Sequence, residues 1–380
     1  MRIALSGMFW PEPNVGSGQY LHNLLAQYIA QPGSHKYSLI IPRYLKSQRP
    51  SLPHVQTVLM PTPFDRRNEN LAKVWFEQIA LNQACRVLRA DLLHVPYFGS
   101  PRRVALPTVV TVHDLIPVLL PQYRGGRAVQ TYMRLAANSA RRATRIIADS
   151  EHTKRDVVEQ LKIDPQRIDV TYLAAASTLQ PQPIEAIAAM RDRFRLLDPY
   201  ICYLGGFDAR KNVATVLRAF ARARAQFDRR VVFVIAGRLP TTTSDLFPDI
   251  HRAILDEGIA DDVVVLGQVS EADKAALMSG CEAFVYPSVY EGFGLQPIEA
   301  MQCGAPVLAS STTSVGEVVG DGGVQLAPED IDAWTAAMAR IVRDGAWREQ
   351  LRARGLERAQ QFSWAETARQ TLAIYERAVA

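Results

Sequence analysis

The sequence has 380 residues, of which 48% are hydrophobic and 21% are charged. This composition is typical of a soluble globular protein, and the length exceeds one ordinary hydrophobic core. No apolar run is long enough to span a membrane, and the run that ends before Pro11 and Pro13 is too short for a signal peptide, so we expect a cytoplasmic protein. The net charge of +5 is uneven: residues 1–180 carry 22 Lys and Arg against 12 Asp and Glu, and the remainder carries 21 against 26. The basic first half favours an anionic partner such as a phospholipid surface, a lipid-linked phosphate or nucleic acid.

Short apolar runs recur along the chain and alternate with stretches of helical spacing. The helical spacing i, i+3, i+4, i+7 is clear at Val213, Val216, Leu217 and Phe220. Runs that are apolar throughout are typical of strands buried on both faces of a parallel sheet. The predicted strands are, in order, RIALSG, YSLIIP, VQTVLM, LLHVP, TVVTVHD, RIIADS and IDVTYL, then YICYLGG, VVFVIAG, VVVLGQV, AFVYPS, PVLAS and GVQLA.

This alternation predicts an α/β protein with two doubly wound, Rossmann-like domains facing a cleft. The break between them is expected within residues 177–199, where Pro181 and Pro183 stiffen the chain and no strand pattern crosses. We therefore assign residues 1–177 to an N-terminal domain, 178–362 to a C-terminal domain, and 363–380 to a final helix that packs back on the N-terminal domain.

Two acids, Glu291 and Glu299, bracket the segment GFGLQPI in an otherwise apolar region. A buried charge is costly unless it has a partner. The backbone N–H groups of GFGL precede a helix that we expect to begin near Pro297, and together they offer an anion site. Glu299 in the first turn of that helix could accept two hydroxyl groups. Alternatively, it is an acid favoured there by the helix dipole.

A second motif follows the strand YICYLGG, where Arg210 and Lys211 precede Asn212, which is placed to cap the next helix. Two adjacent cations on a turn can clamp a diphosphate, and we expect both side chains to be exposed. The alternative is a solvated turn, since neither a Walker loop nor GxGxxG is present. Because the carboxyl ends of parallel strands meet at one edge of a sheet, we expect the two motifs to lie close together at that edge. A site with cations for a diphosphate, and with acids for hydroxyl groups at either end of it, fits a nucleotide-sugar.

The segments YEGFGLQPIEAMQCGAPVLAS and GGFDARKN resemble the retaining glycosyltransferases of family 4, the group 1 glycosyltransferases of GT-B fold. Further matching segments follow in family order and extend the resemblance over most of the chain: TVHDLIP, ADSEHTKRDV, VFVIAGR, VVVLGQVSEADKAALMSGCEAFVYPS and VGEVVGDGG. Within the family, the chain most resembles bacterial mannosyltransferases of surface polysaccharide synthesis.

The resemblance implies roles for individual residues. Glu291 would contact hydroxyl groups of the donor sugar, Glu299 the ribose, and Arg210 with Lys211 the leaving diphosphate. His113 would point at the donor sugar, although a histidine ending a buried strand could instead be structural. Other donor-binding residues would be Gly16 and Gly18 in a partly matching glycine loop, Gly292, Phe293, Gly294 and Leu295 beside Glu291, and Arg238 and Val269 near the base.

The implied reaction moves a sugar, with retention, from a nucleotide-sugar to a hydroxyl group of a glycan or lipid-linked acceptor. GDP-mannose is the favoured donor, and a UDP-sugar is the alternative. No Asp-x-Asp metal motif is evident, the cations already neutralise the phosphates, and the four scattered cysteines lack metal-ligand spacing, so we expect no metal and no cofactor. The alternatives from other classes are a nucleotide-sugar epimerase or hydrolase and a non-catalytic binding subunit. Nucleic acid is not an expected partner, because the basic residues are not interleaved with aromatic motifs.

The segment RAVQTYMRLAANSARRATRII predicts a helix with a basic face. Arg127, Arg134 and Arg141 recur every seven residues, and Arg124, Arg142 and Arg145 widen the stripe. Such a face could hold the protein peripherally on an anionic membrane. The alternative is a solvated face paired with acids from elsewhere in the fold.

Overall fold

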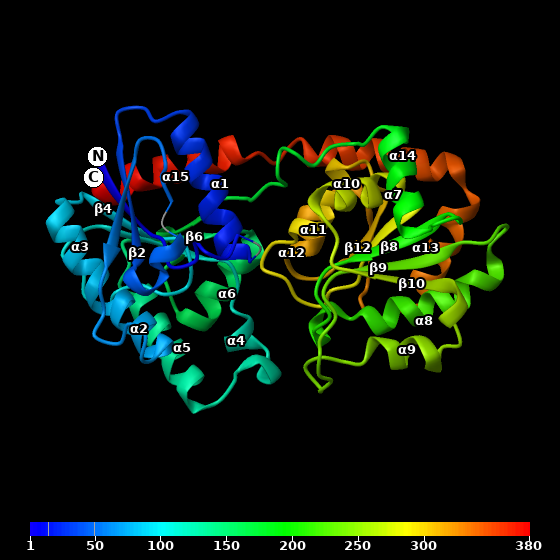
Figure 1. The fold of residues 1–380 in the computed structure, drawn as a ribbon, viewed down its shortest axis with the longest axis horizontal. Coiled ribbons are helices and arrows are strands. Elements are labelled where there is room, and N and C mark those ends of the chain that lie inside the picture. Colours follow the sequence, from blue (N-terminus) through cyan, green and yellow to red (C-terminus); the bar gives the residue numbers. More distant parts are fainter. Residues whose placement is uncertain (14, 49) are drawn as a thin grey trace. The chain divides into compact units, whose positions relative to one another are not determined.

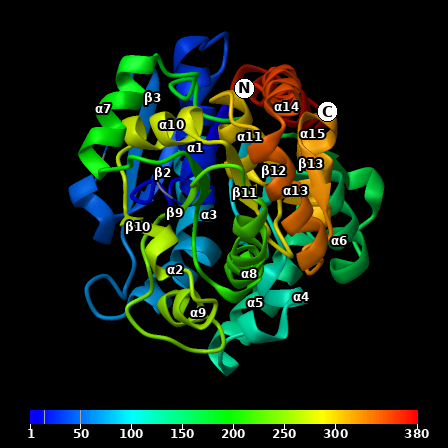
Figure 2. The same cartoon turned by 90° about the vertical axis from the view of Figure 1, so that its right-hand side faces the viewer.

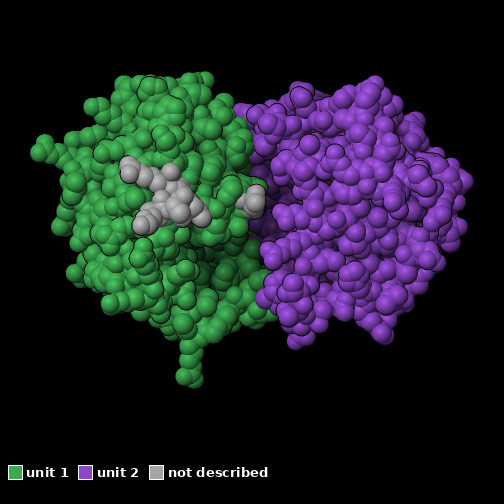
Figure 3. All heavy atoms as spheres, in the orientation of Figure 1, with its two compact units in different colours: residues 1–173, 364–380 green, residues 174–363 purple. Residues whose placement is uncertain are grey.

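The chain forms two compact α/β units, each built on one parallel sheet (Figure 1). The structure, a computed structural model, describes residues 1–13, 15–48 and 50–380. Unit 1 comprises Met1–Leu173 and Trp364–Ala380, and unit 2 comprises Ala174–Ser363, as coloured in Figure 3. Among the described residues, no helix is both long and apolar enough to cross a membrane.

The sheet of unit 1 has seven strands in the order β3-β2-β1-β4-β5-β6-β7, and every neighbouring pair is parallel. The strands coincide with the predicted apolar runs, and the central ones are buried along their whole length. Strand order reverses direction between β1 and β4. The strands are β1 Arg2–Ser6, β2 Lys36–Pro42, β3 Val55–Met60, β4 Leu92–Val95, β5 Thr108–Val112, β6 Arg145–Ala148 and β7 Ile168–Val170.

Helices cover both faces of this sheet, as in a doubly wound fold. A core on one face gathers Phe76, Leu81, Leu93, Val110 and Ile146, all fully buried. The helices of unit 1 are α1 Gly16–Ala30, α2 Glu69–Trp75, α3 Leu81–Leu88, α4 Ile116–Leu119, α5 Arg127–Ala140, α6 Glu151–Leu161 and α15 Trp364–Val379, with a π-helical turn at Phe76–Ala80 and 3₁₀ turns at Arg43–Gln48, Pro121–Tyr123 and Pro165–Arg167.

The C-terminal helix α15 packs on unit 1, beside α1 (Figure 1). His94 of β4 connects the two parts of the unit: its Nδ1 is 2.6 Å from the hydroxyl oxygen of Tyr375, and its Nε2 is 2.9 Å from Oγ1 of Thr111. Burial lowers the pKa of His94 to about 3, so the ring is neutral at physiological pH. The Thr367 hydroxyl also donates to the Tyr172 carbonyl oxygen at 2.6 Å. These buried hydrogen bonds explain why a helix distant in sequence returns to this unit.

The sheet of unit 2 has six parallel strands in the order β10-β9-β8-β11-β12-β13. These strands also coincide with predicted apolar runs, because both faces of the sheet are covered. Strand order reverses between β8 and β11, which are neighbours in the sheet. The strands are β8 Tyr200–Leu204, β9 Val232–Ala236, β10 Val263–Gly267, β11 Ala283–Tyr286, β12 Val307–Ser310 and β13 Val324–Leu326.

On one face of this sheet, α8 and α13 pack side by side (Figure 2). The predicted apolar face of α8 is buried there, with Phe220 and Leu217 in the same cluster as Trp334. The helices of unit 2 are α7 Ile184–Phe194, α8 Val213–Ala223, α9 Ile250–Asp256, α10 Glu271–Gly280, α11 Leu295–Gln302, α12 Thr313–Val319, α13 Ile331–Arg343 and α14 Gly345–Ala359, with 3₁₀ turns at Ala209–Lys211, Arg224–Gln226, Ala260–Asp262 and Gly320–Gly322.

The predicted basic helix in unit 1 is shorter than its sequence pattern suggested. Helix α5 ends at Ala140, and the following residues turn into β6. Arg141 donates from Nε to the Leu161 carbonyl oxygen at 2.7 Å, and Arg145 lies in β6, where it pairs with Asp169 at 2.7 Å. The pairing of β6 with its neighbours overrides helix propensity here, so these two arginines do not belong to a helical stripe.

Candidate functional site

The switch point of the unit-2 sheet brings the two sequence motifs together. The loops after β8 and β11 leave neighbouring strands and then diverge, which is where doubly wound sheets bind ligands. The Val289 N–H donates to the Arg210 carbonyl oxygen at 2.8 Å, and Arg210 donates from its guanidinium to the Tyr290 carbonyl oxygen at 3.2 Å. The two loops, about 80 residues apart in sequence, are therefore held together at the carboxyl edge of the sheet.

At the centre of this edge lies Glu291, which is 9% exposed. Its Oε1 accepts hydrogen bonds from Lys211 Nζ at 2.6 Å, Tyr286 OH at 2.9 Å and Ser288 Oγ at 2.6 Å. The same oxygen pairs with the Arg210 guanidinium at 2.7 Å. We call these five residues the Glu291 network. A carboxylate that accepts this many donors is fixed in one orientation.

The Glu291 network is ionised, and its charge is nearly balanced once the neighbouring Asp208 is included. Burial alone would raise the pKa of Glu291, but Lys211 and Arg210 outweigh it and lower that pKa to about 2. Burial lowers the pKa of Lys211, and Glu291 opposes this effect while Arg210 adds to it. Arg210 also pairs with Asp208 at 3.1 Å. Two cations therefore face two carboxylates.

This geometry corrects the expectation that the two cations are exposed. Lys211 is 5% exposed, and the Arg210 side chain is 16% exposed. Their carboxylate partners draw both side chains into the loop, because a buried cation needs a counter-charge. Asn212 stands at the N-cap position of α8 as expected, but its side chain makes no cap hydrogen bond and donates to the Pro328 carbonyl oxygen at 2.7 Å instead.

The glycine loop after Glu291 leads directly into α11. Gly294 has φ of 111°, a left-handed conformation that favours glycine, and α11 begins at the next residue, Leu295. Gly292 and Phe293 are buried beside it. The helix thus begins two residues before Pro297, so Glu299 lies in its second turn, and the predicted first-turn placement of Glu299 is wrong. The helix-dipole alternative fails with it, since that effect is confined to the first turn.

Glu299 instead pairs with a lysine that the sequence analysis missed. Lys274 of α10 places Nζ 3.0 Å from Glu299 Oε1 and 3.2 Å from Glu271 Oε2, and Glu299 is 7% exposed. Burial raises the pKa of Glu299 despite Lys274, whereas the two carboxylates outweigh burial and raise the pKa of Lys274. The partners come from different helices, so no local spacing could reveal them.

Arg238 and Val269 follow β9 and β10 at the same edge of the sheet. Gly237 allows the close approach of this loop, because a Cβ there would lie 2.2 Å from the Gly205 carbonyl oxygen. Arg238 is exposed and Val269 is half-buried. Among the described residues, no hydrogen bond or ion pair joins either of them to the Glu291 network.

His113 lies in unit 1, directly after β5. Its Nδ1 is 2.7 Å from Asp149 Oδ2, and its Nε2 is 3.2 Å from the Pro96 carbonyl oxygen. Burial lowers the pKa of His113, but the neighbouring Asp149 outweighs burial and the net shift is upward. With an acceptor beside each nitrogen, the imidazolium form donates on both sides. The structural role weighed for this histidine is thus present in the fold.

The two glycines of the predicted loop differ in what the fold requires of them. Gly18, in the first turn of α1, is buried, and a Cβ there would lie 1.9 Å from the Glu12 carbonyl oxygen. Gly16 begins the helix and faces open space. Asn14 of the same motif lies outside the described residues. Close packing therefore demands glycine at position 18.

A hollow of about 200 Å³ lies beside His113 within unit 1, and the sequence analysis missed it. Tyr97 and Tyr132 form part of its wall, together with Lys73, whose Nζ lies 4.8 Å from the centre of the Tyr132 ring. Behind the wall, the Tyr132 hydroxyl donates to the buried Glu77 at 3.0 Å, and burial raises the pKa of Glu77 to about 7. Aromatic faces with polar tips of this kind suit a ligand with both apolar and hydroxyl surfaces.

The fold and the switch-point site place this chain among the doubly wound α/β proteins that bind ligands at the carboxyl edge of a sheet. The family model described as "Glycosyltransferase Family 4" matches residues 15–174, and the model "Glycosyl transferases group 1" matches residues 191–358. Among curated relatives, O-antigen chain mannosyltransferase B of Escherichia coli is 32% identical over 294 residues, which cover 77% of this chain and 76% of that protein.

Two further comparisons extend this result. Serotype-specific mannosyltransferase WbdA of Escherichia coli is 29% identical over 77% of this chain, which spans 37% of that longer protein. The solved structure of Anabaena Alr3699/HepE in complex with UDP and glucose has a TM-score of 0.75 and 18% identity, with 99% of this chain and all of that chain covered. The chain belongs to the group 1, family 4 glycosyltransferases, and it is a glycosyltransferase of GT-B fold.

The burial of Lys211 generates a prediction about stability. Lys211→Met should lower the free energy of unfolding by about 3 kcal/mol, since it removes one cation from a buried, ionised network. The double variant Lys211→Met/Glu291→Gln should lose less than the sum of the two single variants, by about 1–3 kcal/mol. Urea unfolding measures all three. The control is Arg252→Met, which breaks an exposed pair with Asp256 and should cost less than about 1 kcal/mol. Strict additivity would show that the pair is not coupled.

The raised pKa of His113 predicts a pH-dependent contribution to stability. Because the folded state favours the charged ring, its contribution is complete below the unfolded pKa of about 6.5 and is lost as pH rises through the folded value. His113→Gln should therefore reduce the free energy of unfolding more at pH 5.5 than at pH 9. In an Asp149→Asn background the same substitution should no longer cost more at pH 5.5 than at pH 9, because burial then acts without the residue that outweighs it. In the otherwise wild-type protein, a loss that grows with rising pH would contradict the pairing.

Proposed function

We propose that the switch-point site of unit 2 binds the diphosphate and sugar of a nucleotide-sugar, with GDP-mannose favoured, and that the sugar is transferred with retention to a hydroxyl group of a glycan or lipid-linked acceptor in polysaccharide or glycoconjugate synthesis. The observation that carries this proposal is the Glu291 network, in which two cations meet a fixed carboxylate beside a helix N-terminus. The resemblance to two Escherichia coli mannosyltransferases supports mannose as the sugar. The HepE complex with UDP and glucose keeps a UDP-sugar as the alternative donor.

In this proposal the diphosphate competes with Glu291 for Arg210 and Lys211. The network together with Asp208 is nearly neutral, so an arriving diphosphate takes over contacts that these cations make with Glu291 and Asp208. The N–H groups at residues 293–295 and the start of α11 supply further donors. As the bond between the anomeric carbon and the phosphate oxygen breaks, its electron pair goes to the phosphate, and these groups stabilise the growing charge. The acceptor oxygen then bonds to that carbon on the same face and passes its proton to the leaving phosphate.

The two carboxylates receive separate roles. Among the described residues, every donor found to the Glu291 carboxylate contacts Oε1, so Oε2 is available for a sugar hydroxyl group. The low pKa of Glu291 keeps it an ionised acceptor. Glu299, held by Lys274, would accept the ribose hydroxyl groups. Arg238 and Val269 would lie near the base, and the roles of His113, Gly16 and Gly18 at the donor stay predictions.

No divalent metal or other cofactor is part of the proposed reaction, because Arg210 and Lys211 already supply positive charge for the phosphates. Transfer should thus continue in EDTA, and a requirement for added Mg²⁺ would overturn this point. Peripheral contact with an anionic membrane likewise stays a proposal, now resting on Arg124, Arg127 and Arg134, which are exposed. If this contact exists, the protein should sediment with anionic vesicles at low salt and should no longer do so at high salt.

Calorimetry with GDP and UDP tests whether Glu291 and Glu299 have the separate roles proposed for them. Glu299→Gln should weaken binding of the preferred nucleoside diphosphate by about tenfold or more, because it removes a charged hydrogen-bond acceptor. Glu291→Gln should bind it at least as tightly, since Glu291 competes with phosphate for two cations, yet transfer should fall by about 10² or more. The control Glu257→Gln, in a surface pair with Arg218, should change neither. Equal loss of binding in both site variants would show that the roles are misassigned.

A further inference from the structure

A second pocket lies in unit 1 at the opposite edge of its sheet from His113. It has a volume of about 340 Å³ and is bordered by the segment before β5 and the turn before β6, that is, at the amino ends of these strands. His113 follows the carboxyl end of β5. The pocket is therefore separate from the hollow beside His113, and all of its lining residues belong to unit 1.

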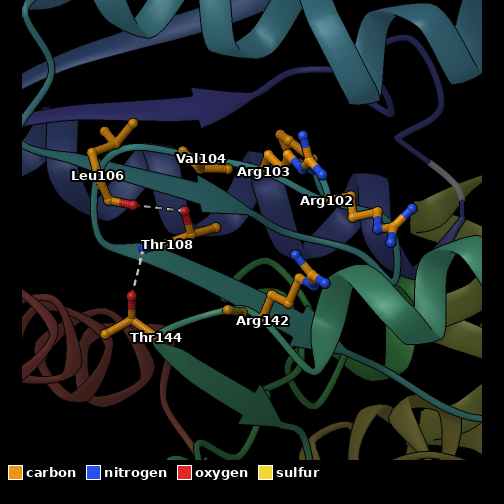
Figure 4. A pocket seen from close by; sticks show the side chains of 9 residues that line it. Arg102, Arg103, Val104, Leu106, Thr108, Arg142 and Thr144 are labelled. Atoms are coloured by element: carbon orange, nitrogen blue, oxygen red, sulfur yellow. Dashed lines mark hydrogen bonds between the residues drawn. The ribbon is translucent and has the colours of Figure 1, made fainter.

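Three arginine side chains surround this pocket. Arg102 and Arg103 come from the segment before β5, and Arg142 comes from the turn after α5; Figure 4 shows them gathered at one side, with Leu106, Thr108 and Thr144 at the other. All three arginines are exposed. In the described part of the chain, none of their guanidinium groups pairs with a carboxylate, and the lining contains no Asp or Glu.

The unpaired state of these arginines contrasts with their neighbours. Arg145 pairs with Asp169, and Arg141 and Arg167 donate to backbone carbonyl oxygens. The neighbouring arginines thus have a carboxylate or carbonyl partner, whereas the three arginines of the pocket have no carboxylate partner among the described residues. Three like charges that share one hollow repel one another, and an anion within it would remove that repulsion.

Side chains of an adjacent helical segment hold the Arg102–Arg103 segment in place. Gln78 donates from its amide to the Ser100 carbonyl oxygen at 2.9 Å and accepts from the Arg102 N–H at 3.0 Å. Asn82 donates to the Arg103 carbonyl oxygen at 2.8 Å. The backbone that carries these two arginines is therefore positioned before any ligand arrives, which reduces the entropy lost on binding.

The opposite rim is fixed in the same way. The Thr108 N–H donates to Thr144 Oγ1 at 3.0 Å, and the Thr144 N–H donates to the Thr108 carbonyl oxygen at 2.8 Å. The Arg142 N–H donates to the Ser139 carbonyl oxygen at 2.9 Å. These bonds join the turn after α5 to the first residue of β5. The backbone that carries Arg142 is therefore also held in place.

We propose that this pocket binds the phosphate group of a phosphorylated ligand. Guanidinium groups match phosphate oxygens in bidentate geometry, and three of them suit a group with two negative charges. The apolar side chains of Val104 and Leu106 in the wall accommodate a carbon skeleton beside the phosphate. A soluble organic phosphate and the headgroup of an anionic phospholipid share this chemistry. The inference does not rest on the function proposed for unit 2.

Calorimetry with pyrophosphate tests the proposal. The variant Arg102→Gln/Arg103→Gln/Arg142→Gln should lose one class of pyrophosphate site or weaken it by about tenfold or more. The control Arg67→Gln/Arg86→Gln/Arg89→Gln removes the same charge from exposed positions of the same unit and should keep that class. If the unit-2 site does not bind pyrophosphate, the wild-type protein shows one class fewer, but the two variants still differ. Unchanged affinity and stoichiometry in the pocket variant would overturn the proposal.

A second arm identifies the source of the phosphate. Sedimentation with phosphatidylglycerol vesicles, against phosphatidylcholine vesicles, is compared for the same two variants. If the pocket takes a lipid headgroup, the pocket variant loses anionic vesicle binding more than the control does. If the ligand is soluble, both variants sediment alike and the pocket variant loses pyrophosphate binding alone. Both outcomes support a phosphate pocket, and retention of both kinds of binding by the pocket variant would contradict it.

Discussion

The buried contact between Lys211 and Glu291 is the interaction on which the unit-2 site depends. Neither charge could remain ionised at this depth alone, and their 2.6 Å contact joins the loop after β8 to the loop after β11. The contact is possible because these two strands are neighbours at the point where the sheet reverses its order. Topology therefore places the charges, and the charges in turn fix the loops that would hold a diphosphate.

Much of this arrangement could be predicted from the sequence, because the signals are local. Strands buried on both faces read as continuous apolar runs, so the strands of both sheets were predictable. The meeting of Arg210 with Glu291 followed from one rule, that the carboxyl ends of parallel strands share an edge. The family resemblance added what local patterns could not, namely the chemistry that such an edge performs.

The features that escaped prediction depend on contacts between distant residues. Lys274 holds Glu299 from another helix, and no spacing links the two. The burial of Lys211 follows from Glu291, about 80 residues away, which reversed the expectation of an exposed cation. Helix α5 ended early because β6 pairs with β5 from Arg145 onward, a tertiary demand stronger than helix propensity. The three-arginine pocket likewise forms from two segments that are far apart in sequence.

A crystal structure of the protein with bound GDP would show whether the switch-point site of unit 2 holds the diphosphate. We expect phosphate oxygens within hydrogen-bonding distance of Arg210, Lys211 and the N–H groups at residues 293–295, with the ribose at Glu299. We also expect fewer hydrogen bonds from the two cations to Glu291 than without nucleotide. A nucleotide bound elsewhere, with the Lys211–Glu291 contact unchanged, would show that this network is not the donor site.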